Sequence, residues 1–293
     1  MAIEMNMSFG RLIRKFRIDR HLTQSQLASG ICNRSTIAIL EKDGTHISYE
    51  LLRQLLDRLN IELNEFELIC SKNDIFYDKE RTRNKFVALL TSHSENDKIN
   101  FFQDVELKFK QINDYFYYAL CAEAHLIISY NTGTLGSQDD YVVKARTSIM
   151  EYLNRIENWD RFELVMFINC LFVFDDDYIL VSLRTAGKLA FLYSNSKNYM
   201  QDFNALVADV LKLAIKRENI KLLNVSLELA NKGLNGLMNT EMIVYKNIIN
   251  FVTKMVQGQA TINDQVVLFN HLSWLGMNGW INCLASANFN KFR

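Results

Sequence analysis

The sequence predicts an all-α protein with a small N-terminal helical domain and a larger C-terminal one. Three observations lead to this prediction. The 293 residues include no proline, the residue that most often breaks a helix interior. Hydrophobic residues recur with a helical period of about 3.6 in most segments, and short polar breaks separate these segments. The chain is also long enough to form two hydrophobic cores.

The first predicted helix runs to about Arg20. Its apolar positions keep a helical period and are Phe9, Leu12, Ile13 and Phe16. Basic residues crowd the same segment and are Arg11, Arg14, Lys15, Arg17 and Arg20. The net charge of the chain is zero, so positive charge is local and the whole molecule is not a general polyanion binder.

Residues 23–41 are typical of a helix-turn-helix. Thr23 and Gln26 form a T-x-x-Q capping box, which predicts the start of a short helix. Gly30 can adopt a positive φ and end that helix. Asn33 is the expected N-cap of a second helix. In a helix-turn-helix of this kind the second helix lies in the major groove of DNA.

The second helix is predicted to bury Ile37 and Leu40 and to direct its other side chains outward. The candidates for DNA contact on this outer face are Arg34, Ser35, Thr36, Ala38 and Ile39. The fork of Arg34 matches the hydrogen-bond acceptors of guanine, and Ala38 or Ile39 can contact a thymine methyl group. The alternatives are a solvated helix arginine for Arg34 and packing on the first helix for Ile39.

Three further residues are predicted to hold DNA phosphates, and these are Gln24, Arg14 and Arg17. Gln24 lies in the first turn of a helix, where a side chain and free backbone N–H groups can bind a phosphate. Arg14 and Arg17 supply positive charge from the first helix. The alternative for both arginines is a basic face that only contacts solvent.

Two more helices are expected to complete the N-terminal module. Asp43 and Gly44 indicate a turn after the second helix of the motif. Ser48 is expected to cap a helix with leucines on its inner face, and a last short helix starts at Asn64. The five helices predict that residues 1–70 form a compact DNA-binding domain.

Residues 8–69 resemble the lambda-repressor-like helix-turn-helix family. The matching segments are GRLIRKFR, LTQSQLA, NRSTIAILE and LLRQLLDRLNIELNEF, in that order. One departure is Asp43, where the family usually has a glycine. Aspartate tolerates a left-handed backbone better than most residues, so we expect the turn to persist.

Residues 71–85 are charged and are interpreted as a linker, or equally as the polar start of a long helix. The remaining residues, 86–293, predict a succession of amphipathic helices. Their expected bounds are 84–92, 95–111, 113–130, 139–156, 160–174, 176–193, 198–217, 219–235, 240–257 and 262–287. This spacing favours stacked helix hairpins of the tetratricopeptide type, with an ordinary helical bundle as the alternative.

The whole chain resembles the Rgg/GadR/MutR transcriptional regulators of Gram-positive bacteria. Beside the N-terminal motifs, the segments IMEYL, IENW and FELVMF between residues 149 and 167 are similar to the central signature of that family. The resemblance implies a homodimer with a C-terminal tetratricopeptide-like domain. It also implies quorum sensing, because many members of the wider group bind short secreted signalling peptides on a concave face of this domain.

Four polar residues within otherwise apolar helices are candidates for binding such a peptide, and these are Asn169, Tyr178, Arg184 and Asn204. A peptide buried in a helical groove needs hydrogen-bond partners for its backbone, and these side chains can supply them. For each residue the alternative is hydrogen bonding within the domain. The predicted helix 262–287 is rich in large apolar residues and is expected to cap the repeats or to lie at the dimer interface.

Enzyme, metal and membrane functions lack support in the sequence. Phosphate-binding, dinucleotide-binding and hydrolase motifs are absent, so we expect neither catalysis nor a cofactor. His125 and His271 have no ligand-type residue at helical spacing, so we expect no metal site. The five cysteines form no C-x-x-C pair, and no signal peptide or long apolar run is present. These features predict a cytoplasmic regulator, with an interaction scaffold that no longer reads DNA as the alternative.

Overall fold

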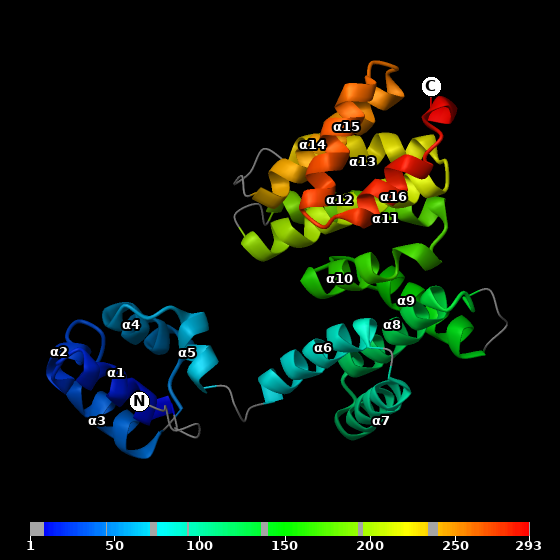
Figure 1. The fold of residues 1–293 in the computed structure, drawn as a ribbon. Coiled ribbons are helices and arrows are strands. Elements are labelled where there is room, and N and C mark those ends of the chain that lie inside the picture. The colour runs from blue at the N-terminus through cyan, green and yellow to red at the C-terminus, as the bar shows by residue number, and fades with distance from the viewer. Residues whose placement is uncertain are drawn as a thin grey trace. The chain divides into compact units, whose positions relative to one another are not determined.

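The computed structural model describes residues 9–44, 46–70, 75–92, 94–135, 140–192, 196–233 and 240–292, and over these residues it contains helices and no strand (Figure 1). The prediction of an all-α protein is therefore confirmed. The chain divides into two units, Met1–Phe101 and Phe102–Arg293. Among the described residues, no helix combines the length and the apolar character needed to cross a membrane.

The N-terminal unit contains the predicted helix-turn-helix. Its helices are α1 (Phe9–Asp19), α2 (Gln24–Ala28), α3 (Arg34–Asp43), α4 (Tyr49–Leu59), α5 (Leu63–Cys70) and α6 (Ile75–Thr91), followed by the start of α7 (Glu95–Ile112). A core of fully buried side chains, including Ile13, Leu27, Ile37, Leu40 and Leu55, holds α1 to α4 together. The apolar period therefore predicts most of this core, although Phe9, an apolar position of the first helix, is 48% exposed.

Helices α1 and α3 pack unusually closely because α1 contributes a glycine to their contact. A Cβ atom on Gly10 would lie 1.7 Å from the carbonyl oxygen of Leu40. Only a residue without a side chain fits at this position, since real Cβ atoms do not approach backbone oxygens so closely. Gly10 thus fixes the distance between the first helix and the helix predicted to contact DNA.

Two expectations about the N-terminal unit need correction. Asp43 was expected to adopt the left-handed turn, but it is the last residue of α3, and Gly44 has the left-handed φ of 59° instead. The glycine has no Cβ to oppose this conformation. Residues 75–85 are part of α6, so the interpretation as the polar start of a long helix describes them better than a linker does.

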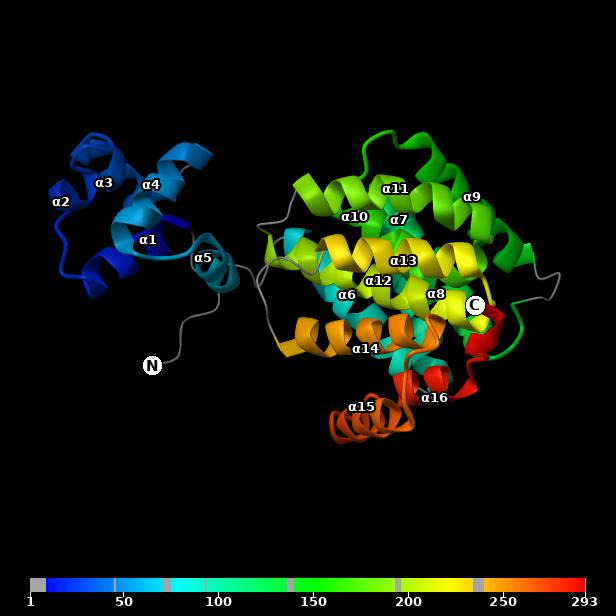
Figure 2. The same cartoon turned by 90° about the horizontal axis from the view of Figure 1, so that it is seen from above.

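The C-terminal unit is a stack of helix hairpins (Figures 1 and 2). After α7 it contains α8 (Tyr115–Asn131), α9 (Asp140–Arg155), α10 (Arg161–Asn169), α11 (Asp176–Leu192), α12 (Lys197–Lys216), α13 (Ile220–Gly233), α14 (Thr240–Val256), α15 (Ile262–Trp274) and α16 (Asn278–Ser286). The tightest pairs are α8 with α9 and α12 with α13. In both views α11, α12, α13 and α14 lie side by side.

Two predicted helices of the C-terminal unit are shorter than expected. The expected helix 160–174 ends at Asn169 and continues as the short 3-10 helix η1 (Leu171–Val173). The expected helix 262–287 is two helices, α15 and α16, separated by residues 275–277. Periodicity missed both breaks because apolar residues continue through them. A second 3-10 helix, η2 (Phe289–Phe292), follows α16 and buries both of its phenylalanines.

Candidate DNA-binding surface and a groove in the C-terminal unit

Helix α2 is fixed at both ends by side chains. The hydroxyl of Thr23 accepts a hydrogen bond from the N–H of Gln26 at 3.2 Å, and the Gln26 side chain accepts one from the N–H of Thr23 at 2.8 Å. This is the predicted capping box. At the other end the guanidinium of Arg58 donates to the carbonyl oxygens of Gln26 and Ser29 at 3.0 and 2.9 Å. Gly30 follows with a φ of 74°, so the turn into α3 has the geometry expected of the motif.

On helix α3 the side chains predicted to face outward include exposed ones, and those predicted to face inward are buried. Ile37 and Leu40 are fully buried, whereas Arg34 and Ser35 are exposed and Ile39 is 52% exposed. Thr36 and Ala38 are half-buried on the same helix. Asn33 has the extended backbone of an N-cap, but its side chain makes no capping hydrogen bond. The free N–H groups at the start of α3 therefore have no side-chain cap from Asn33.

Arg17 lies in a polar cluster inside the N-terminal unit. Its guanidinium donates from Nε and Nη2 to the carboxylate of Glu41 at 2.5 and 2.9 Å, and from Nη1 to the carbonyl oxygen of Leu22 at 2.6 Å. Gln24 donates from Nε2 to the same carboxylate at 3.0 Å. The Arg17 side chain is only 12% exposed, so these contacts connect α1, α2 and α3. This geometry favours a positioning role for Arg17 over the expected phosphate contact.

The charge of Glu41 is stabilised within this cluster. Burial alone would raise the pKa of Glu41, but hydrogen bonds from Arg17 and Gln24 and the positive charges of Arg17 and Arg14 lower the pKa below its usual value. The same hydrogen bond raises the pKa of Arg17. Arg14 itself is exposed on α1. Of the three residues predicted to hold phosphates, Arg14 is thus the one with an exposed charge, and Gln24 is half-buried beside Glu41.

The C-terminal unit contains a groove of about 390 Å³ between α8, α10, η1 and α12. Asn169 lies in its wall and donates from Nδ2 to the buried carboxylate of Glu123 at 2.6 Å. Lys216 donates to the hydroxyl of Tyr130 at 2.8 Å, and the Tyr130 ring lies 4.5 Å from that of Phe172. The groove therefore combines an apolar floor with amide, phenol and ammonium groups at its edge.

The other three peptide-binding candidates lie elsewhere. Asn204, on α12, lines a smaller hollow together with Trp280 of α16. Tyr178 lies on α11 with its ring 4.9 Å from that of Phe174, and burial raises the pKa of its hydroxyl. Arg184 is exposed on α11. The structure thus places only Asn169 in the groove and does not bring the four residues together.

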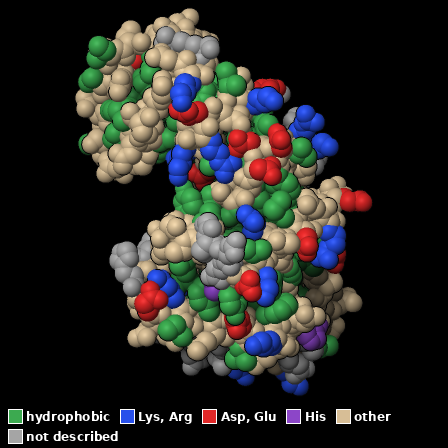
Figure 3. Space-filling view, turned by 90° about the vertical axis from the view of Figure 1, so that its right-hand side faces the viewer, with side chains coloured by type: hydrophobic (Ala, Val, Ile, Leu, Met, Phe, Trp, Pro, Cys, Tyr) green, Lys and Arg blue, Asp and Glu red, His purple; other side chains and the backbone are tan. Residues whose placement is uncertain are grey.

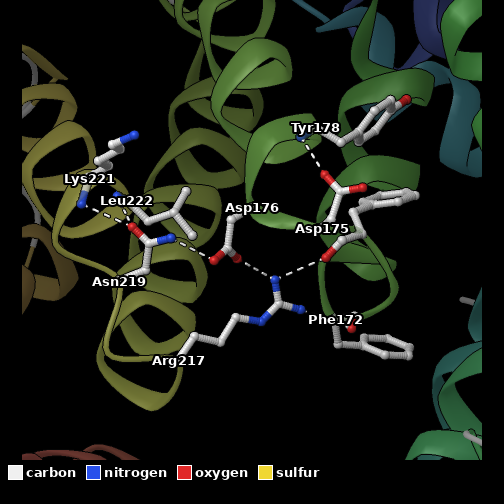
Figure 4. A network of polar contacts seen from close by, with 9 residues as sticks. Phe172, Asp175, Asp176, Tyr178, Arg217, Asn219, Lys221 and Leu222 are labelled. Carbon is white, nitrogen blue, oxygen red and sulfur yellow. Dashed lines mark hydrogen bonds and ion pairs between the residues drawn. The ribbon is translucent and has the colours of Figure 1, made fainter.

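Sequence reasoning missed the polar network that supports one wall of this groove (Figure 4). Arg217 donates to the carbonyl oxygens of Phe172 and Phe174 at 3.2 and 2.9 Å and to Asp176 at 2.7 Å. Asn219 donates to the second oxygen of Asp176 at 2.6 Å. Burial alone would raise the pKa of Asp176, but these bonds lower it. The only signal in the sequence was the acidic run at the start of α11.

Charged side chains of both signs are interspersed on the face of the molecule drawn in Figure 3, which agrees with the net charge of zero. Among the described residues, no group of three or more histidine, cysteine, aspartate and glutamate side chains is arranged to hold a metal ion.

A helix-turn-helix with an exposed second helix, followed by a large helical domain, defines a DNA-binding transcriptional regulator. Residues 13–66 match the helix-turn-helix family model, and residues 102–265 match the model for the C-terminal domain of the HTH-type transcriptional regulator Rgg. The chain belongs to the Rgg family of HTH-type transcriptional regulators. This family consists of regulators of transcription and not of enzymes.

Solved structures show the same fold. The pheromone receptor Rgg2 of Streptococcus dysgalactiae is 19% identical, with a TM-score of 0.69 over 94% of this chain and 98% of that one. A putative transcriptional regulator of Listeria monocytogenes is 21% identical, with a TM-score of 0.73 over 98% and 97%. A bacterial peptide pheromone–receptor complex is 14% identical, with a TM-score of 0.65 over 95% and 99%. No curated protein matched the sequence.

Proposed function

We propose that this regulator binds operator DNA in the cytoplasm as a homodimer, with α3 of each subunit in a major groove. The main support for this proposal is that Arg34, Ser35 and Ile39 are exposed on one helix, α3. Arg34 reads guanine, Ser35 and Thr36 contact a base edge or a phosphate, and Ile39 or Ala38 packs on a thymine methyl group. Two-fold symmetry then requires half-sites separated by about one helical turn of DNA, or a multiple of it.

Arg14 and Gln24 are proposed as phosphate contacts beside this row. Gln24 is oriented by Glu41, which accepts a hydrogen bond from its amide nitrogen. Arg17 is proposed to act indirectly, because its guanidinium already donates to Glu41 and Leu22. Loss of Arg17 would therefore misplace α3 relative to α1 instead of removing one ion pair with DNA.

A mobility-shift titration on the region upstream of the gene tests the DNA proposal. Arg34→Ala is expected to weaken specific binding by about 1–3 kcal/mol and to relax the preference at one base pair. Arg14→Ala is expected to weaken binding to all sequences and to reduce the salt slope by about one unit. Absence of specific binding by the unmodified protein would favour the alternative, a scaffold that no longer reads DNA. Unchanged affinity of both variants would refute the contacts assigned to Arg34 and Arg14.

We further propose that a short signalling peptide binds the groove between α8, α10, η1 and α12. Its apolar floor and its polar edge suit an apolar peptide whose backbone needs hydrogen bonds. Two of the similar structures are a pheromone receptor and a complex of a peptide pheromone with its receptor, which supports a peptide as the ligand. Asn169 is proposed to accept a peptide N–H through its amide oxygen, because its nitrogen is engaged by Glu123.

Isothermal titration with short hydrophobic peptides encoded beside the gene tests this proposal. Asn169→Ala is expected to weaken peptide binding by about tenfold, the effect of about 1.4 kcal/mol. Variants Tyr178→Phe, Arg184→Ala and Asn204→Ala test whether the remaining candidates contribute. If only these three variants weaken binding, the peptide occupies a different face of the unit and the proposed groove is wrong.

A further inference from the structure

A second groove, of about 290 Å³, lies between α7, α8 and α9 in the C-terminal unit. Its walls carry five rings, and these are Phe109, Tyr117, Tyr118, His125 and Tyr141. The ring centroids of His125 and Tyr141 are 5.4 Å apart, and those of Phe109 and Tyr118 are also 5.4 Å apart. The groove shares no residue with the one assigned to the peptide.

Three charged residues line this ring-lined groove, and a fourth, Lys108, lies 5.7 Å from the centroid of the Tyr117 ring but is paired with Asp104. Glu106 and Lys110 are one turn apart on α7, so their charges largely offset each other. Lys144, exposed on α9, leaves one net positive charge at the edge. Burial and the negative charge of Glu106 raise the pKa of Cys121 to about 12. The Cys121 thiol therefore stays protonated and contributes an apolar wall, not a nucleophile.

We propose that this groove binds a small planar aromatic molecule with one negative charge, such as an aromatic carboxylate. A volume near 300 Å³ and a mainly apolar lining with few polar groups are typical of small-ligand sites. Phe109, Tyr118 and Tyr141, one from each of the three helices, can contact a flat ligand from different sides. His125 is stacked on Phe102 and Tyr141, and Tyr117 is fully buried, so these two rings only support the wall. Lys144 provides the charge that selects an anion over a neutral molecule of the same shape. The protein thus has a ligand site separate from both its proposed DNA-binding surface and its proposed peptide groove.

Titration of the protein with 8-anilinonaphthalene-1-sulfonate tests the site, because this anion carries a planar naphthalene ring system and fluoresces strongly when it leaves water. We expect saturable binding of one probe per chain. Tyr141→Ala and Lys144→Ala should each weaken it by about tenfold, the effect of a lost contact of about 1.4 kcal/mol. Tyr141 is 64% exposed and Lys144 is exposed, so neither substitution opens the core.

Matched controls separate this groove from general adsorption of the probe. Tyr49→Ala truncates a tyrosine of similar exposure, 56%, and Lys246→Ala removes an exposed lysine of α14. Both should bind the probe as the unmodified protein does. So should Asn169→Ala, unless the probe occupies the peptide groove, in which case the proposal is overturned. Absence of saturable binding, or equal affinity in the Tyr141 and control variants, would also overturn it.

A neutral probe tests the selection of charge. N-phenyl-1-naphthylamine has the same two ring systems without the sulfonate. It should bind the unmodified protein about tenfold more weakly than the anion, and its affinity should not change in Lys144→Ala. If Lys144→Ala weakens both probes equally, Lys144 acts through packing and the proposed preference for an anion is refuted. The Arg34→Ala variant should bind both probes as the unmodified protein does. Failure of the DNA proposal would therefore not affect the outcome of the probe titrations.

Discussion

In the N-terminal unit, the roles of some residues can be predicted from neighbouring residues in the sequence, whereas the roles of others depend on how the helices pack. Thr23, Gln26 and Gly30 act within a few residues of one another, so their sequence spacing predicts their roles. Arg17 and Glu41 are 24 residues apart, and their pairing depends on how α1 packs on α3. Periodicity gives the buried face of each helix but not which faces meet. For this reason the sequence favours a phosphate contact for Arg17, whereas the structure shows its guanidinium bonded to Glu41 and Leu22.

Glu41→Gln is expected to destabilise the N-terminal unit by about 3 kcal/mol at pH 7, because it leaves the buried Arg17 without a counter-charge. Urea unfolding followed by hydrogen exchange of α1 and α3 peptides measures the change. Glu50→Gln, an exposed glutamate of α4, is the matched control and should have little effect. Equal stability of the two variants would mean that the Arg17–Glu41 pair contributes little.

The same residue predicts a pH dependence. Because the pKa of Glu41 is lowered in the folded state, its stabilisation is complete above the ordinary glutamate value of about 4.3 and is lost as the pH falls through the lower folded-state value. The unmodified protein should therefore lose stability of α1 and α3 on acidification more steeply than Glu41→Gln. Parallel urea midpoints for the two proteins between pH 7 and pH 3.5 would contradict this prediction.

At the scale of helices, most elements of the C-terminal unit were predictable because each has a clear apolar stripe and a polar break. The exceptions, at η1 and between α15 and α16, occur where apolar residues continue through a change of direction. The groove beside η1 was not predictable, since its walls come from α8, α10 and α12. Only Asn169 among the proposed peptide ligands lies there.

Gly10→Ala should separate α1 from α3, because its Cβ would lie 1.7 Å from the Leu40 carbonyl oxygen. We expect a loss of about 3 kcal/mol, the upper part of the usual range for overpacking, together with weaker DNA binding. Thermal unfolding and mobility shift measure the two effects. In Gly279→Ala a Cβ meets no atom within 4 Å, so this control should keep both properties.

Arg217→Ala removes the hydrogen bonds that connect η1 and the start of α11 with the end of α12. We expect a loss of about 1–3 kcal/mol, because the Asp176 carboxylate and two carbonyl groups lose a charged donor. The midpoint of thermal unfolding is the measurement. Arg184→Ala, an exposed arginine on α11, should leave the midpoint unchanged. A similar fall in both variants would argue against a specific role for this network.

At the scale of the whole molecule, the proposed dimer requires an apolar surface that a single chain leaves uncovered. Helix α15 offers such a surface, because Ile262 at its start is 84% exposed and Trp274 at its end is 86% exposed, and Val266 and Val267 between them are 50% and 44% exposed. Exposed apolar patches of this kind mark interaction sites. We propose that this helix, which the sequence placed at either a cap or an interface, contacts its counterpart in a second subunit.

Sedimentation at micromolar concentration tests this assembly. The unmodified protein should be a dimer, and Trp274→Asp should shift it toward the monomer by placing a charge in an apolar interface. Val181→Asp, at an exposed valine of α11, is the control and should remain dimeric. A monomeric unmodified protein would refute the dimer, whereas a dimeric Trp274→Asp would place the interface on another surface.

Arg217, at the end of α12, connects the groove to a helix that does not line it. A single guanidinium group bonds the backbone of the turn behind Phe172 and also the aspartate that anchors Asn219, two residues further along its own chain. Phe172 is thus connected to Asn219, at the start of α13, through three consecutive hydrogen bonds. A ligand that displaces Phe172 would therefore shift the start of α13 relative to α12. Helix α13 would then respond to binding in the groove although it does not touch the ligand.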